Sequence, residues 1–126
     1  MSVTDPRPEP LAVSECRRVG EVLGRIGDKW TVLVIAELGE GPVRFNALQR
    51  AIRGVSQRML TLTLKNLERD GLVSRTVTPT VPPRVDYALT DLGRSMLAPV
   101  QALGDWAAAH IPQMDAARRR YDARDN

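Results

Sequence analysis

The sequence predicts a mainly α-helical domain with one small β-hairpin. Apolar residues recur at helical spacing along most of the chain, so helices should dominate the structure. The segment after residue 71 is instead rich in β-branched residues around three prolines, which indicates two strands joined by a stiff tip. A length of 126 residues with 43% apolar content suits one hydrophobic core, so we expect a single domain.

The two ends of the chain differ in composition from the region between them. Proline occupies every second position in residues 6–10, which favours extended backbone, and residues 1–12 are expected to form a disordered leader. Residues 113–126 contain three consecutive arginines and are expected to form a polar tail. The folded domain is therefore predicted over residues 13–112.

Two helices are expected before the first break in the pattern. The first covers residues 14–26 with Ser14 at its N-cap, and Gly27 ends it. Asp28 can cap the second helix, which is expected over residues 30–38 and is apolar on nearly all sides. Because a small domain has little material to cover such a helix, we expect a second chain to bury part of it.

A helix-turn-helix is predicted next. Residues 39–42 contain two glycines and a proline and break the chain before a short helix over residues 46–52. A tight turn at Gly54 leads to a longer helix over residues 56–70, which ends at Gly71. Two helices joined by a short turn that contains glycine form this motif.

The last elements are a hairpin and a terminal helix. Strands are expected at residues 72–77 and 84–89, on either side of the proline-rich tip. Thr90 and Asp91 should cap a helix with an apolar stripe, which Pro99 interrupts and Pro112 stops. A hairpin behind a helix-turn-helix forms a wing, so the predicted architecture is a winged helix-turn-helix with terminal dimerisation helices.

Basic residues are concentrated in the middle of the chain. The whole chain carries a formal net charge of +3. Residues 44–84 contain eight basic and two acidic residues, a net charge of +6, so the remainder carries −3. A basic centre suits a surface that faces DNA phosphates, because counterion release supplies most non-specific affinity. A solvated arginine-rich face is the alternative.

The helix predicted over residues 56–70 has leucines on one side and polar residues on the other. Four polar residues can pair with base edges in the major groove: Ser56, Gln57, Arg58 and Thr61. Four basic residues are predicted to contact phosphates from this helix, its approach or the wing: Arg44, Lys65, Arg75 and Arg84. An ordinary solvated helix is the alternative. Leu62 lies outside the apolar stripe and could touch a thymine methyl, pack on another helix or simply stay exposed.

Six motifs and one cysteine connect the chain to a known family. They are Cys16, IGDKW (26–30), GPVRFNAL (41–48), SQRMLT (56–61), LERDGLV (67–73), VPPRVDY (81–87) and LTDLGR (89–94). Over about residues 16–106 the chain resembles HxlR-family regulators, which are similar in fold to MarR-type winged helices. The resemblance implies a homodimer formed by terminal helices and a near-palindromic operator. Arg17 and Leu62 depart from the family pattern, which commonly has proline and a polar residue at these positions.

The resemblance also directs attention to Cys16, since some members of the family respond to oxidants or electrophiles through a cysteine at this position. Cys16 is the only cysteine, so a disulfide within the chain is excluded. Two interpretations remain open, a reactive thiol beside Arg17 and a packed, inert one. The dimer interface is predicted to include Trp30, Leu103 and Trp106.

Other classes of protein fit the sequence less well. His110 is the only histidine and lies on the terminal apolar stripe, and no metal-ligand cluster, phosphate-binding glycine loop or nucleophile with a base is recognisable, so we expect no enzyme, metal or cofactor. A winged helix that binds proteins or RNA without operator specificity is the main alternative. No apolar run is long enough to span a bilayer and residues 1–10 lack a secretory signal, so a cytoplasmic protein is expected, with a small-molecule or electrophile inducer as a further partner.

Overall fold

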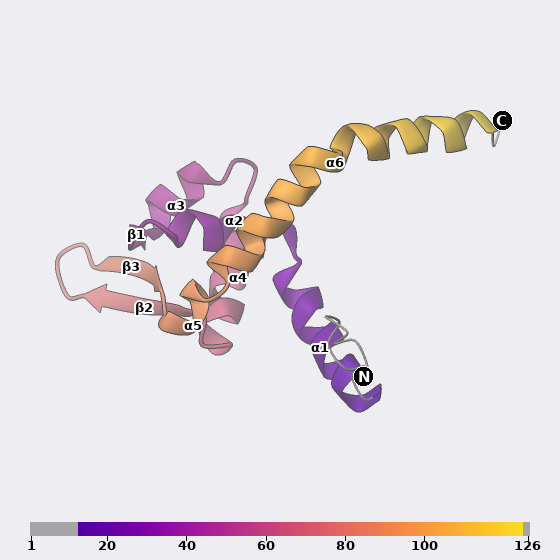
Figure 1. The fold of residues 1–126 in the computed structure, drawn as a ribbon. Helices are drawn as coiled ribbons and strands as arrows, with labels where there is room; N and C mark the ends of the chain where they lie inside the picture. Colours follow the sequence, from indigo (N-terminus) through magenta and orange to yellow (C-terminus); the bar gives the residue numbers. More distant parts are fainter. Residues whose placement is uncertain (1–12, 125–126) are drawn as a thin grey trace.

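The computed structural model describes residues 13–124, which form helices and a small antiparallel sheet that projects from one side of them (Figure 1). The elements in chain order are α1 (Val13–Ile26), α2 (Lys29–Leu38), β1 (Val43–Arg44), α3 (Phe45–Ala51), α4 (Gln57–Arg69), β2 (Val73–Thr78), β3 (Arg84–Leu89), α5 (Asp91–Arg94) and α6 (Leu97–Arg124). This order confirms the predicted winged helix-turn-helix. The leader expected at residues 1–12 lies outside the described residues.

The junction between α1 and α2 depends on Asp28. Its Oδ1 accepts hydrogen bonds from the backbone amides of Trp30 at 2.9 Å and Thr31 at 3.4 Å, so Asp28 caps α2 as predicted. The start of α1 differs from the prediction. This helix begins at Val13, so Ser14 lies inside it and not at the N-cap.

The apolar helix α2 forms the centre of the domain. Val34, Ile35 and Leu38 are fully buried, in contact with a core to which α4, β3 and the start of α6 contribute. Trp30 is half-buried and packs against the same core. Elements distant in the sequence therefore cover much of α2 within one chain. Leu33 stays 39% exposed, so burial of part of α2 by a second chain remains a prediction.

The helix-turn-helix consists of α3 and α4. Ser56 caps α4, since its Oγ accepts a hydrogen bond of 3.0 Å from the amide of Met59. The buried face of α4 is the predicted one and contains Leu60, Thr63, Leu64 and Leu67. Gly71 follows α4 with a φ of +78°, a left-handed conformation that favours glycine.

The sheet contains one strand more than the sequence predicts. Its order is β1-β3-β2, and both pairings are antiparallel. The hairpin of β2 and β3 closes with Thr78 opposite Arg84. The two-residue strand β1 pairs Val43 with Tyr87 and Arg44 with Asp86, and it is too short to produce an alternating pattern in the sequence.

The terminal helix begins at the predicted cap, but its continuity and its C-terminal end are predicted wrongly. It is divided into α5 and α6, and α6 continues through Pro112 to Arg124. Residues 113–124, expected as a polar tail, are therefore helical. Pro99 lies in the first turn of α6, where an amide has no helical partner and proline is tolerated. Pro112 lies inside α6, which bends near its middle in Figure 1, as an internal proline requires.

The short helix α5 is held against the hairpin by a close backbone approach. A Cβ atom added to Gly93 would meet the carbonyl oxygen of Leu72 at 2.1 Å, far inside any normal contact, so only glycine fits there. Thr90 caps α5, because its Oγ1 accepts a hydrogen bond from the amide of Gly93 at 3.1 Å. These contacts determine the direction in which α6 leaves the domain.

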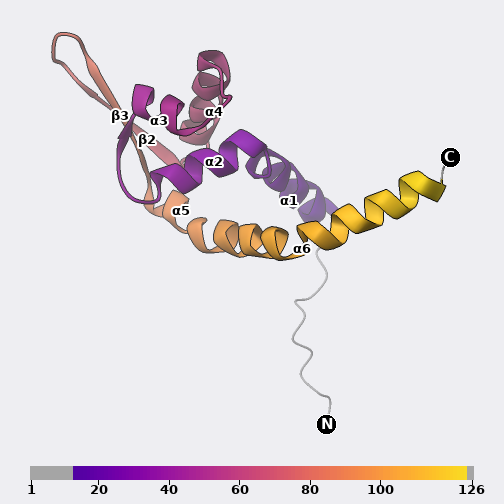
Figure 2. The same cartoon turned by 90° about the horizontal axis from the view of Figure 1, so that it is seen from above.

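The two terminal helices extend away from the wing. Figures 1 and 2 show α1 and α6 projecting on the side of the domain opposite the hairpin tip. No residue of α6 is buried. Even its large apolar side chains are exposed, Leu103 by 70% and Trp106 by 55%. On α1, Val19, Val22 and Leu23 are also exposed. Along residues 13–124, none of the helices combines the length and the apolar character that crossing a membrane would require.

Candidate DNA interface

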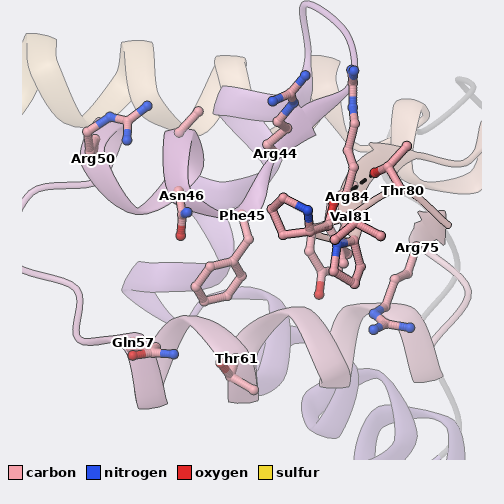
Figure 3. Close-up of a pocket in the computed structure, with 15 residues that line it drawn as sticks. Arg44, Phe45, Asn46, Arg50, Gln57, Thr61, Arg75, Thr80, Val81 and Arg84 are labelled. Carbon is pink, nitrogen blue, oxygen red and sulfur yellow. Dashed lines mark hydrogen bonds between the residues drawn. The ribbon is translucent and has the colours of Figure 1, made fainter. Parts of the chain in front are cut away.

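A groove of about 930 Å³ lies between α3, the start of α4 and the wing (Figure 3). Four arginines line it and define what we call the arginine groove: Arg44, Arg50, Arg75 and Arg84. Among the described residues that line it there is no aspartate or glutamate. Such a surface attracts anions and suits a phosphate backbone.

The four arginines come from four different elements. Arg44 ends β1, Arg50 lies on α3, Arg75 on β2 and Arg84 at the start of β3. Pairing of β1 with β3 and of β3 with β2 brings the strand residues together across the sheet. Of the four, only Arg84 forms an ion pair with another described residue, Asp86, at 3.0 Å between Nε and Oδ2. The other guanidinium groups are available for phosphates.

Helix α4 contributes polar side chains to the same groove. Gln57 and Thr61 line it from α4, opposite Phe45 of α3 (Figure 3). Arg58 and Lys65 are exposed on α4 but do not line the groove. A ligand seated in the groove therefore meets the first turns of α4 together with the arginines.

Two aromatic residues connect α3 to β3 at the arginine groove. The ring centres of Phe45 and Tyr87 are 6.4 Å apart and the rings are tilted by 52°. Tyr87 is buried and Phe45 packs against the core, as their spacing in the sequence suggested. These rings fix α3 on β3, so the positions of Arg44 and Arg84 depend on the hydrophobic core.

Sequence reasoning missed two residues of the site. Asn46 and Arg50 line the groove from α3. They are four residues apart on a helix whose Leu48 is buried, so they share a solvent-facing side. The helical projection used for α4 would have found them if it had been applied to α3.

The remaining predicted site residues lie elsewhere. Ser56 uses its Oγ to cap α4, Cys16 is exposed on α1, and Leu103 and Trp106 lie on α6. Leu62 is 49% exposed and lines a separate pocket of about 200 Å³ between α4 and the α1–α2 junction, away from the arginine groove. Across residues 13–124, His, Cys, Asp and Glu side chains form no group of three that could hold a metal ion.

Comparison with known proteins places this site in a family. Residues 25–115 match the family described as HxlR-like helix-turn-helix. YtfH of Escherichia coli K12, an uncharacterised HTH-type transcriptional regulator, is 44% identical over 98 residues, which are 78% of each chain. Among solved structures, the redox regulator HypR in its reduced form is 36% identical with a TM-score of 0.73, over 79% of this chain and 98% of its own.

A second solved structure is similar to this chain. The reduced form of the transcriptional regulator YodB from B. subtilis is 36% identical with a TM-score of 0.66, over 73% of this chain and 90% of its own. The matched residues 25–115 contain α2 to α5, most of α6 and the whole arginine groove. The protein belongs to the HxlR-like helix-turn-helix family of transcriptional regulators.

Proposed function

We propose that the protein represses transcription by binding a near-palindromic operator in double-stranded DNA as a homodimer. The observation that carries this proposal is the arginine groove beside the polar face of α4. A phosphate backbone in the groove would hold the first turns of α4 against base edges in the major groove. Repression would follow because the bound dimer excludes other proteins from the same DNA.

The residues have distinct proposed roles. Base edges would be read from the start of α4 by Gln57, Arg58 and Thr61, with Ser56 adding a hydroxyl that also caps the helix. Phosphates would be bound by Arg44, Lys65, Arg75 and Arg84, and we add Arg50 and Asn46 of α3 to this group.

The homodimer is supported by the exposed apolar residues on α1 and α6. Leu23 is 60% exposed on α1, and Leu103 and Trp106 are each more than half exposed on α6. Trp106 stacks on His110 with ring centres 4.6 Å apart, which extends this apolar surface along α6. Apolar surface of this kind marks a protein interface. Trp30 packs in its own core, so we place the main interface on α1 and α6.

The alternative of RNA binding receives less support. Modules that read RNA stack unpaired bases on exposed aromatic rings. Near the groove the aromatic residues are Phe45 and Tyr87, and both pack against the core.

Selection of bound duplexes from a random double-stranded library tests the proposal. It should enrich a near-palindromic sequence that competes far better than random duplex or single-stranded RNA, and absence of enrichment would contradict the proposed function.

On the selected operator, Arg58→Ala and Lys65→Ala should behave differently. We expect Arg58→Ala to cost about 1 to 3 kcal/mol and to relax the preference at one base pair in each half-site, because a guanidinium can pair with guanine. Lys65→Ala should weaken binding to all sequences alike, because a phosphate contact carries no sequence information. Binding curves on the operator and on each single-base variant measure both effects. Equal and uniform losses would remove Arg58 from base reading.

Cys16 offers a second, regulatory role. It is exposed on α1, beside residues proposed to form the dimer interface. We propose that diamide joins Cys16 of the two chains in a disulfide, with the two thiol hydrogens passing to diamide, and that the new bond shifts the two reading helices. The similarity to HypR, which is named a redox regulator, supports this role. Diamide should lower operator binding reversibly in the wild type and leave Cys16→Ser unchanged. Unchanged wild-type binding would contradict this regulatory role.

A further inference from the structure

The tip of the wing differs chemically from the rest of the candidate DNA interface. Residues 79–83 read Pro-Thr-Val-Pro-Pro and carry no charge, whereas Arg75 and Arg84 flank them on the two strands. Val81 is the most exposed large apolar side chain among the described residues, with a relative exposure of 101%. Figure 2 shows the connection between β2 and β3 projecting well beyond the helices. An apolar side chain at the end of the wing is removed from water only when a binding partner covers it.

The tip is held in one shape by its own contacts. The hydroxyl of Thr80 donates a hydrogen bond of 2.8 Å to the carbonyl oxygen of Pro82, and the amide of Thr80 donates one of 2.8 Å to the carbonyl oxygen of Thr78. The three prolines restrict φ and carry no amide hydrogen. Thr80 thus uses its hydroxyl and its amide within the tip, and Val81 presents a fully exposed apolar side chain to a partner.

The position of the tip limits what that partner can be. Thr80, Val81 and Pro82 line the arginine groove together with Arg44 and Arg84 (Figure 3). A DNA backbone held by these arginines passes directly beside the tip. On a duplex whose major groove is occupied by α4, a wing reaches the adjacent minor groove.

We propose that Val81 contacts the floor of this minor groove and makes the protein prefer A·T over G·C base pairs beside each half-site. This inference rests on the proposed function and deepens it, because the arginines would supply affinity while the uncharged tip supplies discrimination. Other proteins that bind the minor groove also place apolar side chains against the base pairs, in their case as wedges between base steps.

The discrimination follows from the chemistry of the groove floor. A G·C pair places the N2 amino group of guanine there, whereas an A·T pair presents only acceptors. A valine methyl pressed against the amino group would displace its water without accepting a hydrogen bond, which is unfavourable. The A·T floor lacks this protruding group and is narrower, so it fits a small apolar side chain better.

Inosine separates this mechanism from base reading in the major groove. An I·C pair lacks the minor-groove amino group but keeps the major-groove pattern of G·C. The selected operator is therefore prepared with A·T, G·C or I·C pairs beside each half-site, and the wild-type protein is titrated against all three. We expect about five- to tenfold weaker binding to the G·C form, and I·C binding close to A·T.

Val81→Thr is the matched variant, because threonine has nearly the shape of valine and adds a hydroxyl that can accept from the guanine amino group. It should bind the A·T form nearly as well as the wild type and lose most of the penalty for G·C. Val77→Thr is the control, since Val77 is exposed on the same hairpin but does not line the groove, and its preference should match the wild type.

Three results would overturn the inference: equal wild-type binding to the three flanks, I·C binding as weak as G·C, or an unchanged preference in Val81→Thr. Each leaves operator binding intact and so refutes only the role of Val81. Failure of the wild type to bind any selected duplex better than random DNA would instead refute the proposed function and this inference together.

Discussion

Raising the salt concentration from about 50 mM to about 200 mM is expected to weaken operator binding by about 1,000-fold. Five basic residues of each chain are proposed to contact phosphates, and a minimum of three per chain gives a dimer at least six such contacts. Each neutralised phosphate contributes about −0.9 to the slope of log affinity against log salt concentration, which gives a slope of roughly −5. The cause is the release of counterions from DNA as the arginine groove replaces them.

The slope should fall when a groove arginine is removed. In Arg50→Gln we expect its magnitude to decrease by about 2, since a dimer loses two phosphate contacts. Arg118→Gln is the matched control, because Arg118 is exposed on α6 far along the chain from the groove, and its slope should equal that of the wild type. Titrations at four or more salt concentrations measure each slope. A wild-type slope near zero would show that the arginine groove does not face DNA.

Ending the chain after Ala98 should convert the dimer to a monomer and weaken operator binding by about 100-fold or more. The truncation keeps Leu97, which packs against the core, and removes the exposed apolar residues of α6. Two linked reading helices gain about 10² to 10⁴ in affinity from effective concentration, and a monomer loses this gain. The half-sites, about 34 to 36 Å apart, would then be bound independently.

A double substitution that keeps the whole of α6 tests the same interface in the full-length chain. Leu103→Asp combined with Trp106→Asp places charges on the exposed apolar surface without touching the core, since both side chains are more than half exposed. Sedimentation should give a monomer, and operator binding should fall as in the truncation. Gln113→Glu, at an exposed polar position of α6, is the control and should remain a dimer. If either disrupted protein still sediments as a dimer, the interface lies elsewhere.

The reading face of α4 could be predicted because it depends on local sequence. Leu60, Leu64 and Leu67 recur at helical spacing and are buried, which leaves Gln57 and Thr61 on the opposite side. The caps at Asp28 and Ser56 and the glycine after α4 were predictable for the same reason, since each involves residues within one helical turn.

The arginine groove was only partly predictable. Arg44, Arg75 and Arg84 were expected to contact phosphates. Helical spacing places Arg50 on the solvent-facing side of α3, but it does not show that this side meets the strands that carry the other three arginines. The groove exists because β1 pairs with β3, a contact between residues more than forty positions apart. The length of α6 also escaped prediction, since Pro112 normally stops a helix and here lies within one.

By itself the sequence determined the class of the fold, the order of its main helices, the face of α4 that is polar and the family to which the chain belongs. These properties follow from periodicity, capping and short motifs, whose physical causes act within a few residues. Only the tertiary structure decided that Val34, Ile35 and Leu38 of α2 are buried within one chain, that four arginines share one groove and that Val81 is fully exposed at the tip of the wing. Those outcomes depend on which segments, far apart in the sequence, pack together and bury their apolar surfaces, and this is a property of the whole folded chain.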